Sequence, residues 1–164
     1  MISNLNIMFP EIFLSLSIFT ILMIGAFLKN SFNIIFNLSS LIMITTIVII
    51  LSNSNNEEKI FLNSFVRDAF SNYFKILILL AALFVLNSSR NFITDNKLDK
   101  FEYPIIILLS ILGMFFMVSS NDLILFYLGL ELQSLSLYIL ASIDRDNLKS
   151  SEAGIKYFVL SALS

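Results

Sequence analysis

Acid–base chemistry in this sequence must rely on carboxylates, lysines, hydroxyls or water, because the chain contains no His and no Cys. Four charged residues interrupt or border its long apolar stretches: Glu11, Lys75, Glu131 and Lys156. A charge at the centre of a bilayer costs at least about 2.5 to 3.5 kcal/mol on insertion scales. Each of the four therefore needs an explanation, and side chains of these types suit proton transfer better than electron transfer.

Glu131 is the strongest candidate, because it lies near the middle of an apolar stretch, too deep for its carboxylate to reach the interface. Tyr127, Ser134 and Tyr138 share its helical face, since residues three, four and seven positions apart lie on one side of a helix. The carboxylate could fasten two helices through hydrogen bonds. It could also carry a proton, or set the charge of a neighbouring group, in a hydrated path, and we favour this second interpretation.

Lys156 follows Glu152 by one helical turn, and the simplest explanation is an ion pair at the membrane edge. Alternatively, Lys156 and Glu131 differ in depth by only about 7 Å if their helices meet at one membrane face. Within about 4 Å of each other, their attraction would be about 4 kcal/mol at an effective dielectric constant of 20. We predict that both belong to a proton relay, while the sequence leaves open whether they touch.

Lys75 and Glu11 lie closer to predicted helix starts. The ammonium of Lys75 could extend into the headgroup layer, or the residue could take part in the relay, and these two interpretations are equally supported. Glu11 follows Pro10 at the start of the first helix, where a carboxylate favours the helix dipole. We therefore predict that Glu11 is a helix-dipole partner or an interfacial residue, in preference to a member of the relay.

The composition of the chain indicates a membrane protein. Apolar residues make up 57% of the 164 residues and charged residues 13%, whereas soluble domains have about 25% charged residues. Mean hydropathy is +0.88. A net charge of −2 without a basic run excludes nucleic acid as a partner. The lack of Cys and His excludes disulfides, thiolate iron–sulfur sites and the common haem and zinc sites, so no metal site is expected.

Six apolar stretches predict an all-α transmembrane bundle in a single domain, with five full spans and a partial sixth. About 20 helical residues cross a bilayer core of 30 Å, and the predicted helices cover 7–28, 33–51, 70–88, 103–120, 122–142 and 151–164. The chain must turn back at Ser119–Asp122, where Asn121 or Asp122 is predicted to cap the next helix. The IFLNSFV segment, residues 60–66, is predicted to pair as a short strand.

Loop charges predict the orientation of the bundle. Six basic residues fall on one face and two on the other, and by the positive-inside rule the six lie on the matrix or cytoplasmic side. The six are Lys29, Arg90, Lys97, Lys100, Arg145 and Lys149, and the two are Lys59 and Arg67. The sixth stretch offers about 21 Å of helix, too short to cross. The chain is therefore predicted to be an N-terminal fragment that packs against a second polypeptide.

Two motifs, NDLILFYLGLELQSLSLYILAS and SSEAGIKYFVLSALS, resemble the antiporter-like membrane subunits of respiratory complex I, most closely those of the subunit 2 type. FPEIFL, VRDAFSNYFKILILL and FEYPIIILLSILGMFFMVSSNDL agree with this resemblance. It implies a proton-translocating subunit in which Glu131 matches the glutamate of helix five and Lys156 the lysine of helix six. The glutamate would control the charge of lysines in its own or the adjacent subunit.

The resemblance also implies partners and a location. NADH, flavin, iron–sulfur clusters and ubiquinone would be bound by other subunits, so this chain is expected to hold no cofactor. Its partners would be the other membrane-arm subunits, membrane lipid and a separate polypeptide with the remaining helices. With six residues before the first span there is no room for a cleaved transit peptide, which fits a protein made inside an organelle or a bacterium. With the resemblance to complex I, we predict an organelle-encoded protein of the mitochondrial inner membrane.

Two alternatives remain. The chain could be a subunit of a multisubunit cation/proton antiporter or of a membrane hydrogenase, both related to complex I. It could also be a purely structural membrane module, in which Glu131 and Lys156 only fasten helices.

Overall fold

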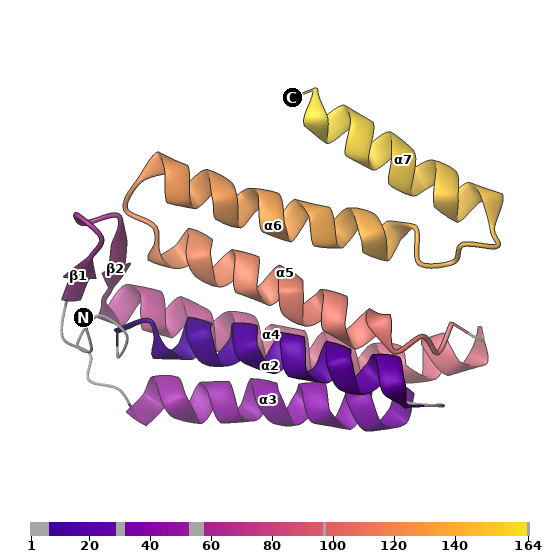
Figure 1. Ribbon diagram of the computed structural model, residues 1–164, viewed down its shortest axis with the longest axis horizontal. Coiled ribbons are helices and arrows are strands. Elements are labelled where there is room, and N and C mark those ends of the chain that lie inside the picture. The colour runs from indigo at the N-terminus through magenta and orange to yellow at the C-terminus, as the bar shows by residue number, and fades with distance from the viewer. Residues whose placement is uncertain (1–6, 29–31, 53–57, 97, 164) are drawn as a thin grey trace.

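The computed structural model describes residues 7–28, 32–52, 58–96 and 98–163, and it is a helical bundle with one small hairpin (Figure 1). Five of its helices are long and apolar enough to cross a membrane, which confirms the predicted class of a transmembrane helical bundle. Lys29 and Lys97 of the predicted positive face lie outside the described residues. The helices are α2 (Phe9–Phe27), α3 (Phe32–Ser52), α4 (Ala69–Asp95), α5 (Glu102–Ser119), α6 (Leu123–Ala141) and α7 (Leu148–Ala162).

Helix α4 begins next to its predicted start and ends later than predicted. A capping box fixes the start: the Ser71 backbone N–H donates to Asp68 Oδ1 at 2.8 Å, and the Asp68 N–H donates to Ser71 Oγ at 3.0 Å. The helix then continues past residue 88 to Asp95. Polar side chains near the predicted end bond to the helix's own carbonyls, as Asn87 does to Leu83 O, so the helix can continue beyond the apolar core.

Residues 58–67 form an antiparallel hairpin of β1 (Glu58–Ile60) and β2 (Phe65–Arg67). The predicted strand over 60–66 is therefore wrong in its centre, because Phe61, Leu62 and Asn63 form the turn, with φ of 54°, 55° and 71°. The left-handed region is unfavourable for bulky residues such as Phe and Leu, and hydrophobic periodicity could not indicate it.

The turn between α5 and α6 lies where the sequence placed it, but its capping was predicted wrongly. Asp122 occupies the N-cap position of α6 and its side chain makes no capping bond. Asn121 bonds to the hairpin instead: its backbone N–H donates to Ser64 O at 2.9 Å and its Nδ2 to Asn63 O at 3.0 Å. These bonds fasten the hairpin over one end of the bundle.

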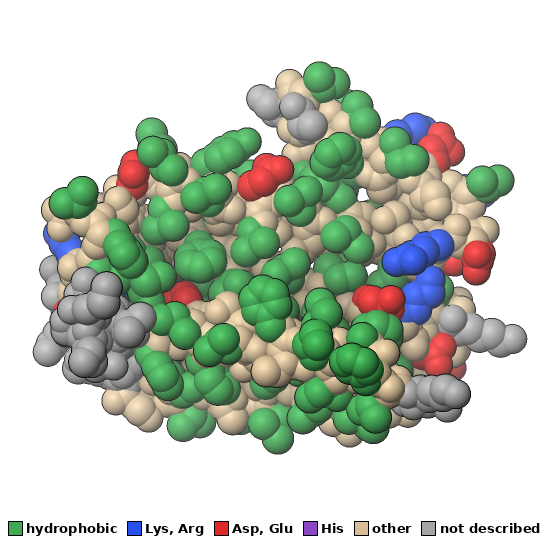
Figure 2. Space-filling view, in the orientation of Figure 1, with side chains coloured by type: hydrophobic (Ala, Val, Ile, Leu, Met, Phe, Trp, Pro, Cys, Tyr) green, Lys and Arg blue, Asp and Glu red, His purple; other side chains and the backbone are tan. Residues whose placement is uncertain are grey.

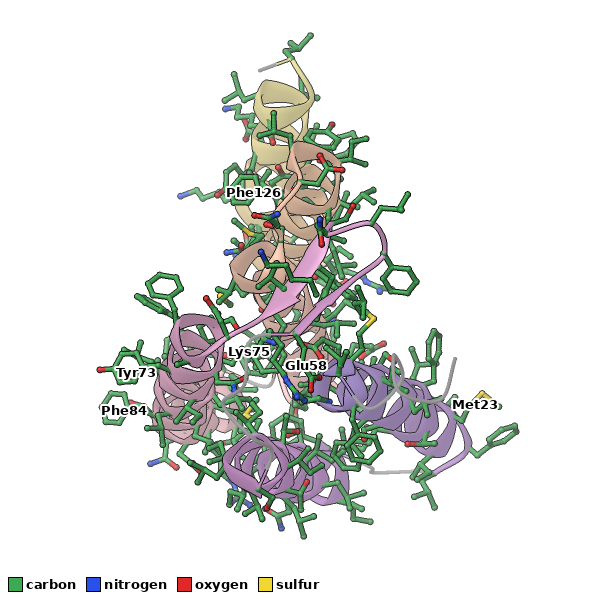
Figure 3. The ribbon with its side chains drawn as sticks, turned by 90° about the vertical axis from the view of Figure 1, so that its left-hand side faces the viewer. Met23, Glu58, Tyr73, Lys75, Phe84 and Phe126 are labelled. Carbon is green, nitrogen blue, oxygen red and sulfur yellow. The ribbon has the colours of Figure 1, made fainter. Side chains whose placement is uncertain are left out.

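Helix α5 is the centre of the bundle. Seen from the hairpin end, α2, α3, α4 and α5 pack around one apolar core, and α6 and α7 extend from α5 in one direction (Figure 3). Of the span residues, 56% are buried in α5 and only 17% in α6. The α6 and α7 side of this chain is therefore largely uncovered.

Two glycines allow α5 and α6 to pack closely. A Cβ atom at Gly113 would lie 2.7 Å from the Gln133 backbone N and 2.8 Å from the Gly129 O. A Cβ at Gly129 would lie 2.8 Å from the Gly113 O. The glycines are too far apart in sequence to form the four-residue spacing of a helix dimer motif, and the structure shows that the pair acts across two helices.

Candidate proton-transfer residues

Glu131 lies at the middle of α6, eight residues after the helix begins at Leu123. Its side chain is partly buried, and none of the ion pairs among the described residues includes it. Ser134 Oγ donates to the backbone carbonyl of Glu131 at 3.0 Å rather than to its carboxylate. The carboxylate is thus held at mid-helix without a cation from the described part of this chain.

The residues predicted to share a polar face with Glu131 differ in their exposure to solvent. Tyr127 is 63% exposed, whereas Tyr138 is 7% exposed and packs against α7. The Tyr138 hydroxyl donates to Ser161 Oγ, and the Tyr138 ring lies edge-on to the Tyr157 ring, with 4.8 Å between centroids. Tyr138 therefore joins α6 to α7, while Tyr127 lies on the exposed surface and Glu131 is only partly buried.

Lys156 makes the ion pair that its spacing predicted. Its Nζ lies 2.6 Å from Glu152 Oε1, one helical turn earlier, and the two side chains are 68% and 62% exposed. Among the described residues no ion pair joins Lys156 to Glu131, so the structure does not pair the two predicted relay residues.

The structure instead pairs the two residues that sequence reasoning treated separately. Lys75 Nζ lies 2.5 Å from Glu11 Oε1, and both side chains are only 1% exposed. Lys75 projects inward at the hairpin end of the bundle, whereas Tyr73 and Phe84 on the same helix project outward (Figure 3). Glu11 lies in the first turn of α2, as predicted for a helix-dipole partner. Its burial contradicts the interfacial alternative, and the ion pair contradicts the snorkelling of Lys75.

Aromatic rings enclose this ion pair. Lys75 Nζ lies 5.5 Å from the centroid of Phe65 in β2 and 5.8 Å from that of Phe115 in α5, within the range of cation–π attraction. Both rings are buried, at 1% and 0% exposure. Glu11 Oε2 has no hydrogen-bond partner among the described residues. The carboxylate consequently keeps a free acceptor atom beside an ammonium group.

The sequence contained a signal for this pair that weighing each charge separately missed. Glu11 follows the start of α2 by two residues and Lys75 the start of α4 by six, and both helices start at the same face. At 1.5 Å per residue their depths differ by about 6 Å, a distance that a long lysine side chain can span. Considering opposite charges of similar depth in different helices together would have found it.

Known proteins resemble this chain in sequence. A family model described as NADH:quinone oxidoreductase/Mrp antiporter, transmembrane, matches residues 120–164, which include α6 and α7. NADH-quinone oxidoreductase subunit N of Pelagibacter ubique is 51% identical over 98% of this chain and 34% of the relative. Subunit N of Bartonella bacilliformis is 46% identical over 99% of this chain and 34% of the relative.

A solved structure resembles the fold. A chain of respiratory complex I from Thermus thermophilus with bound aureothin superposes with a TM-score of 0.76 and 25% identity, over 94% of this chain and 33% of that chain. This chain thus spans about a third of the length of the relatives it matches. In sequence it is similar to one third of NADH-quinone oxidoreductase subunit N, and in fold to one third of a chain of respiratory complex I.

Proposed function

We propose that this chain contributes to the proton-translocating membrane arm of an NADH:quinone oxidoreductase, as part of a subunit of the N or subunit 2 type. The observation that carries the proposal is similarity to subunit N over nearly the whole chain. A carboxylate in the middle of a membrane-crossing helix, Glu131, suits this role. Redox energy released elsewhere in the complex would drive proton movement here, and the chain itself would hold no NADH, flavin, iron–sulfur cluster or quinone.

In this proposal Glu131 and Lys156 act with helices that this sequence does not include. The uncovered faces of α6 and α7 carry large apolar side chains, among them Leu128, Leu130 and Leu160, at 58%, 39% and 69% exposure. Further helices of the same fold would cover these faces. They would bring Glu131 and Lys156 into contact with other charged groups of the relay.

Lys75 has a different part in the proposal. Its ion pair with Glu11 is enclosed within this chain, so it would hold α2 to α4 and keep one end of the bundle rigid. The lysine was predicted as a relay residue with an equal alternative, and its burial beside Glu11 favours this positioning role.

The proposed location is an energy-converting membrane. The relatives from Pelagibacter ubique and Bartonella bacilliformis are bacterial proteins. They give no support to the mitochondrial inner membrane and the organelle encoding that were predicted from the sequence. Other membrane-arm subunits of the complex and the lipid around them are the proposed partners.

A second candidate function is a subunit of a multisubunit cation/proton antiporter. It is favoured by the family model, whose description joins NADH:quinone oxidoreductases with Mrp antiporters. The two functions differ in their driving force: proton movement would follow NADH oxidation in the first and an ion gradient in the second.

The test is Glu131→Gln in the complex that contains the chain. This change removes the titratable group and keeps the size of the side chain. We expect NADH-driven proton uptake into vesicles to fall by at least about tenfold, as for loss of a proton-transfer group, while the complex still assembles. Glu131→Asp should retain part of the activity, because it keeps a carboxylate.

Asp146→Asn is the matched control, since it removes an exposed acidic group from the loop after α6. It should pump normally. Normal pumping by assembled Glu131→Gln would refute the relay role. Loss of assembly in Glu131→Gln, with normal pumping per assembled complex, would show that Glu131 only fastens helices.

A further inference from the structure

An apolar groove of about 530 Å³ lies between α2, α5 and α6, on the outside of the bundle. Helix α5 forms its floor with Ile105, Ile106, Leu109 and Leu112, which follow one another at spacings of one helical face. Hydrophobic side chains dominate the molecular surface over these helices, whereas acidic and basic side chains gather at the end where α5 begins (Figure 2).

The length of the groove matches one leaflet of a bilayer. It extends along α5 from Glu102 to Leu112, ten residues or about 15 Å of helix. Half of a hydrocarbon core of about 30 Å is also about 15 Å. Because Glu102 is the first residue of α5, the groove runs from one membrane face to about the middle of the bilayer.

An extended hydrocarbon chain suits this groove. Among the residues that line it, only Ser15, Glu102 and Arg145 are polar or charged. A hydrocarbon chain brings no polar groups that apolar walls would leave without hydrogen bonds.

Two opposite charges stand at the open end of the groove. Glu102 and Arg145 both line it, and no ion pair within 4 Å joins them to each other or to another described residue. The nearby Lys100 is already engaged, since its Nζ donates to Ile143 O at 3.0 Å. The mouth therefore offers one carboxylate and one guanidinium to a ligand that carries both signs of charge.

We propose that this groove binds one phospholipid whose headgroup carries a primary ammonium. An acyl chain lies along α5, the phosphate binds Arg145, and the ammonium donates to Glu102. A guanidinium matches phosphate geometry through two parallel hydrogen bonds. A primary ammonium donates hydrogen bonds that the quaternary ammonium of phosphatidylcholine lacks, so Glu102 selects between these headgroups.

The chain is suited to a direct test because it contains no Trp. Phe19 lines the groove on α2 and is 67% exposed, so Phe19→Trp places one fluorophore on the groove wall. Phe84→Trp is the matched control: Phe84 is 75% exposed on α4 and projects away from the bundle (Figure 3). The full chain is reconstituted in phosphatidylcholine vesicles that contain a small fraction of phospholipid brominated on its acyl chains, which quenches the fluorescence of a nearby indole.

In the Phe19→Trp variant we expect brominated phosphatidylethanolamine to quench the fluorescence more strongly than brominated phosphatidylcholine or phosphatidylglycerol at equal mole fraction. The relative binding constant over phosphatidylcholine should be about fivefold, as for one accessible ion pair. In the Phe84→Trp variant the three lipids should quench equally. Adding Glu102→Gln to Phe19→Trp should abolish the preference over phosphatidylcholine, and adding Arg145→Gln should weaken binding of every phospholipid in the groove.

Control substitutions for these charges are Asp146→Asn and Lys149→Gln, which are exposed near the same face and do not line the groove. Helix content from circular dichroism identifies variants that fold, and Leu22→Trp on the groove wall replaces Phe19→Trp if that variant does not. Equal quenching by all three lipids at the groove would overturn the proposal. Weaker quenching by every lipid in Phe19→Trp than in Phe84→Trp would also overturn it, and would indicate that protein occupies the groove.

Discussion

Two pairs of opposite charges in this chain have similar contact distances and very different surroundings. Lys75 and Glu11 join two helices at 2.5 Å, and their side chains are 1% exposed. Lys156 and Glu152 lie on one helix at 2.6 Å, and their side chains are 68% and 62% exposed. The first pair is enclosed by Phe65 and Phe115, whereas the second lies on a face that this chain leaves uncovered.

The difference separates what this chain completes by itself from what it leaves open. Around Lys75 the hairpin and α5 supply the rings that surround the ammonium. Around Glu131 and Lys156 no described element supplies an opposing charge from another helix. Charges of the first kind are paired within the chain, and those of the second kind are available to the assembly that we propose.

The largest effect is expected from Lys75→Met, which replaces the lysine by an unbranched apolar side chain and leaves Glu11 buried without a cation. Removing one partner of a buried ion pair typically costs about 3 to 5 kcal/mol. We expect the free energy of unfolding of the chain in detergent, followed by circular dichroism, to fall by about this amount.

The double variant Glu11→Gln with Lys75→Met is the control, because it removes both charges together. A well-packed neutral replacement of a buried ion pair is often close to neutral in stability. The double variant should therefore recover most of the loss. If Lys75→Met and the double variant are equally unstable, packing of the lysine stem and not the unpaired carboxylate explains the loss.

A smaller effect is expected where the two regions meet, at the glycine contact between α5 and α6. Gly113→Ala gains about 1 kcal/mol of helix propensity, but its Cβ would lie 2.7 Å from the Gln133 backbone N. Since backbone cannot move aside easily, we expect a net loss of about 1 to 3 kcal/mol in the free energy of unfolding.

Gly154→Ala provides the comparison on the other side of α6. Its Cβ would lie 2.6 Å from the Ser142 side chain and 3.3 Å from the Tyr138 carbonyl, so a small side chain at the end of α6 has to shift. The loss should be smaller than at Gly113. An equal or larger loss at Gly154 would show that α7 is as firmly packed on α6 as α6 is on α5.

Much of this fold follows from hydropathy alone. Spans of apolar residues place α2, α3, α5 and α6, because about 20 such residues are needed to cross a bilayer. Hydropathy ends α4 too early, because it treats polar residues such as Asn87 as the end of the helix. Asn87 instead bonds to a carbonyl of its own helix. The hairpin turn escapes the same reasoning, since hydropathy does not indicate the positive φ angles of Phe61 and Leu62.

The candidate site was predictable in part. Glu131 is found from its depth in the membrane, and the Lys156–Glu152 pair from its spacing of four residues. Matching depths in α2 and α4 make a Lys75–Glu11 pair possible, but whether the two residues meet depends on how these helices are arranged, which no local rule gives. The groove between α2, α5 and α6 likewise exists only after three helices have packed.

The smallest effect is expected from Glu152→Gln, which breaks the exposed pair with Lys156. In the isolated chain the loss should be less than about 0.5 kcal/mol, since exposed pairs one turn apart contribute little. In the assembled complex the same substitution should cost more. Covering helices would remove the lysine from solvent, and an unpaired charge away from solvent has a larger free-energy cost. Thermal inactivation of the complex measures the second value. Equal small losses in both would mean that Lys156 stays exposed after assembly, and the contrast between the two charge pairs would then be a property of the complete complex as well as of this chain.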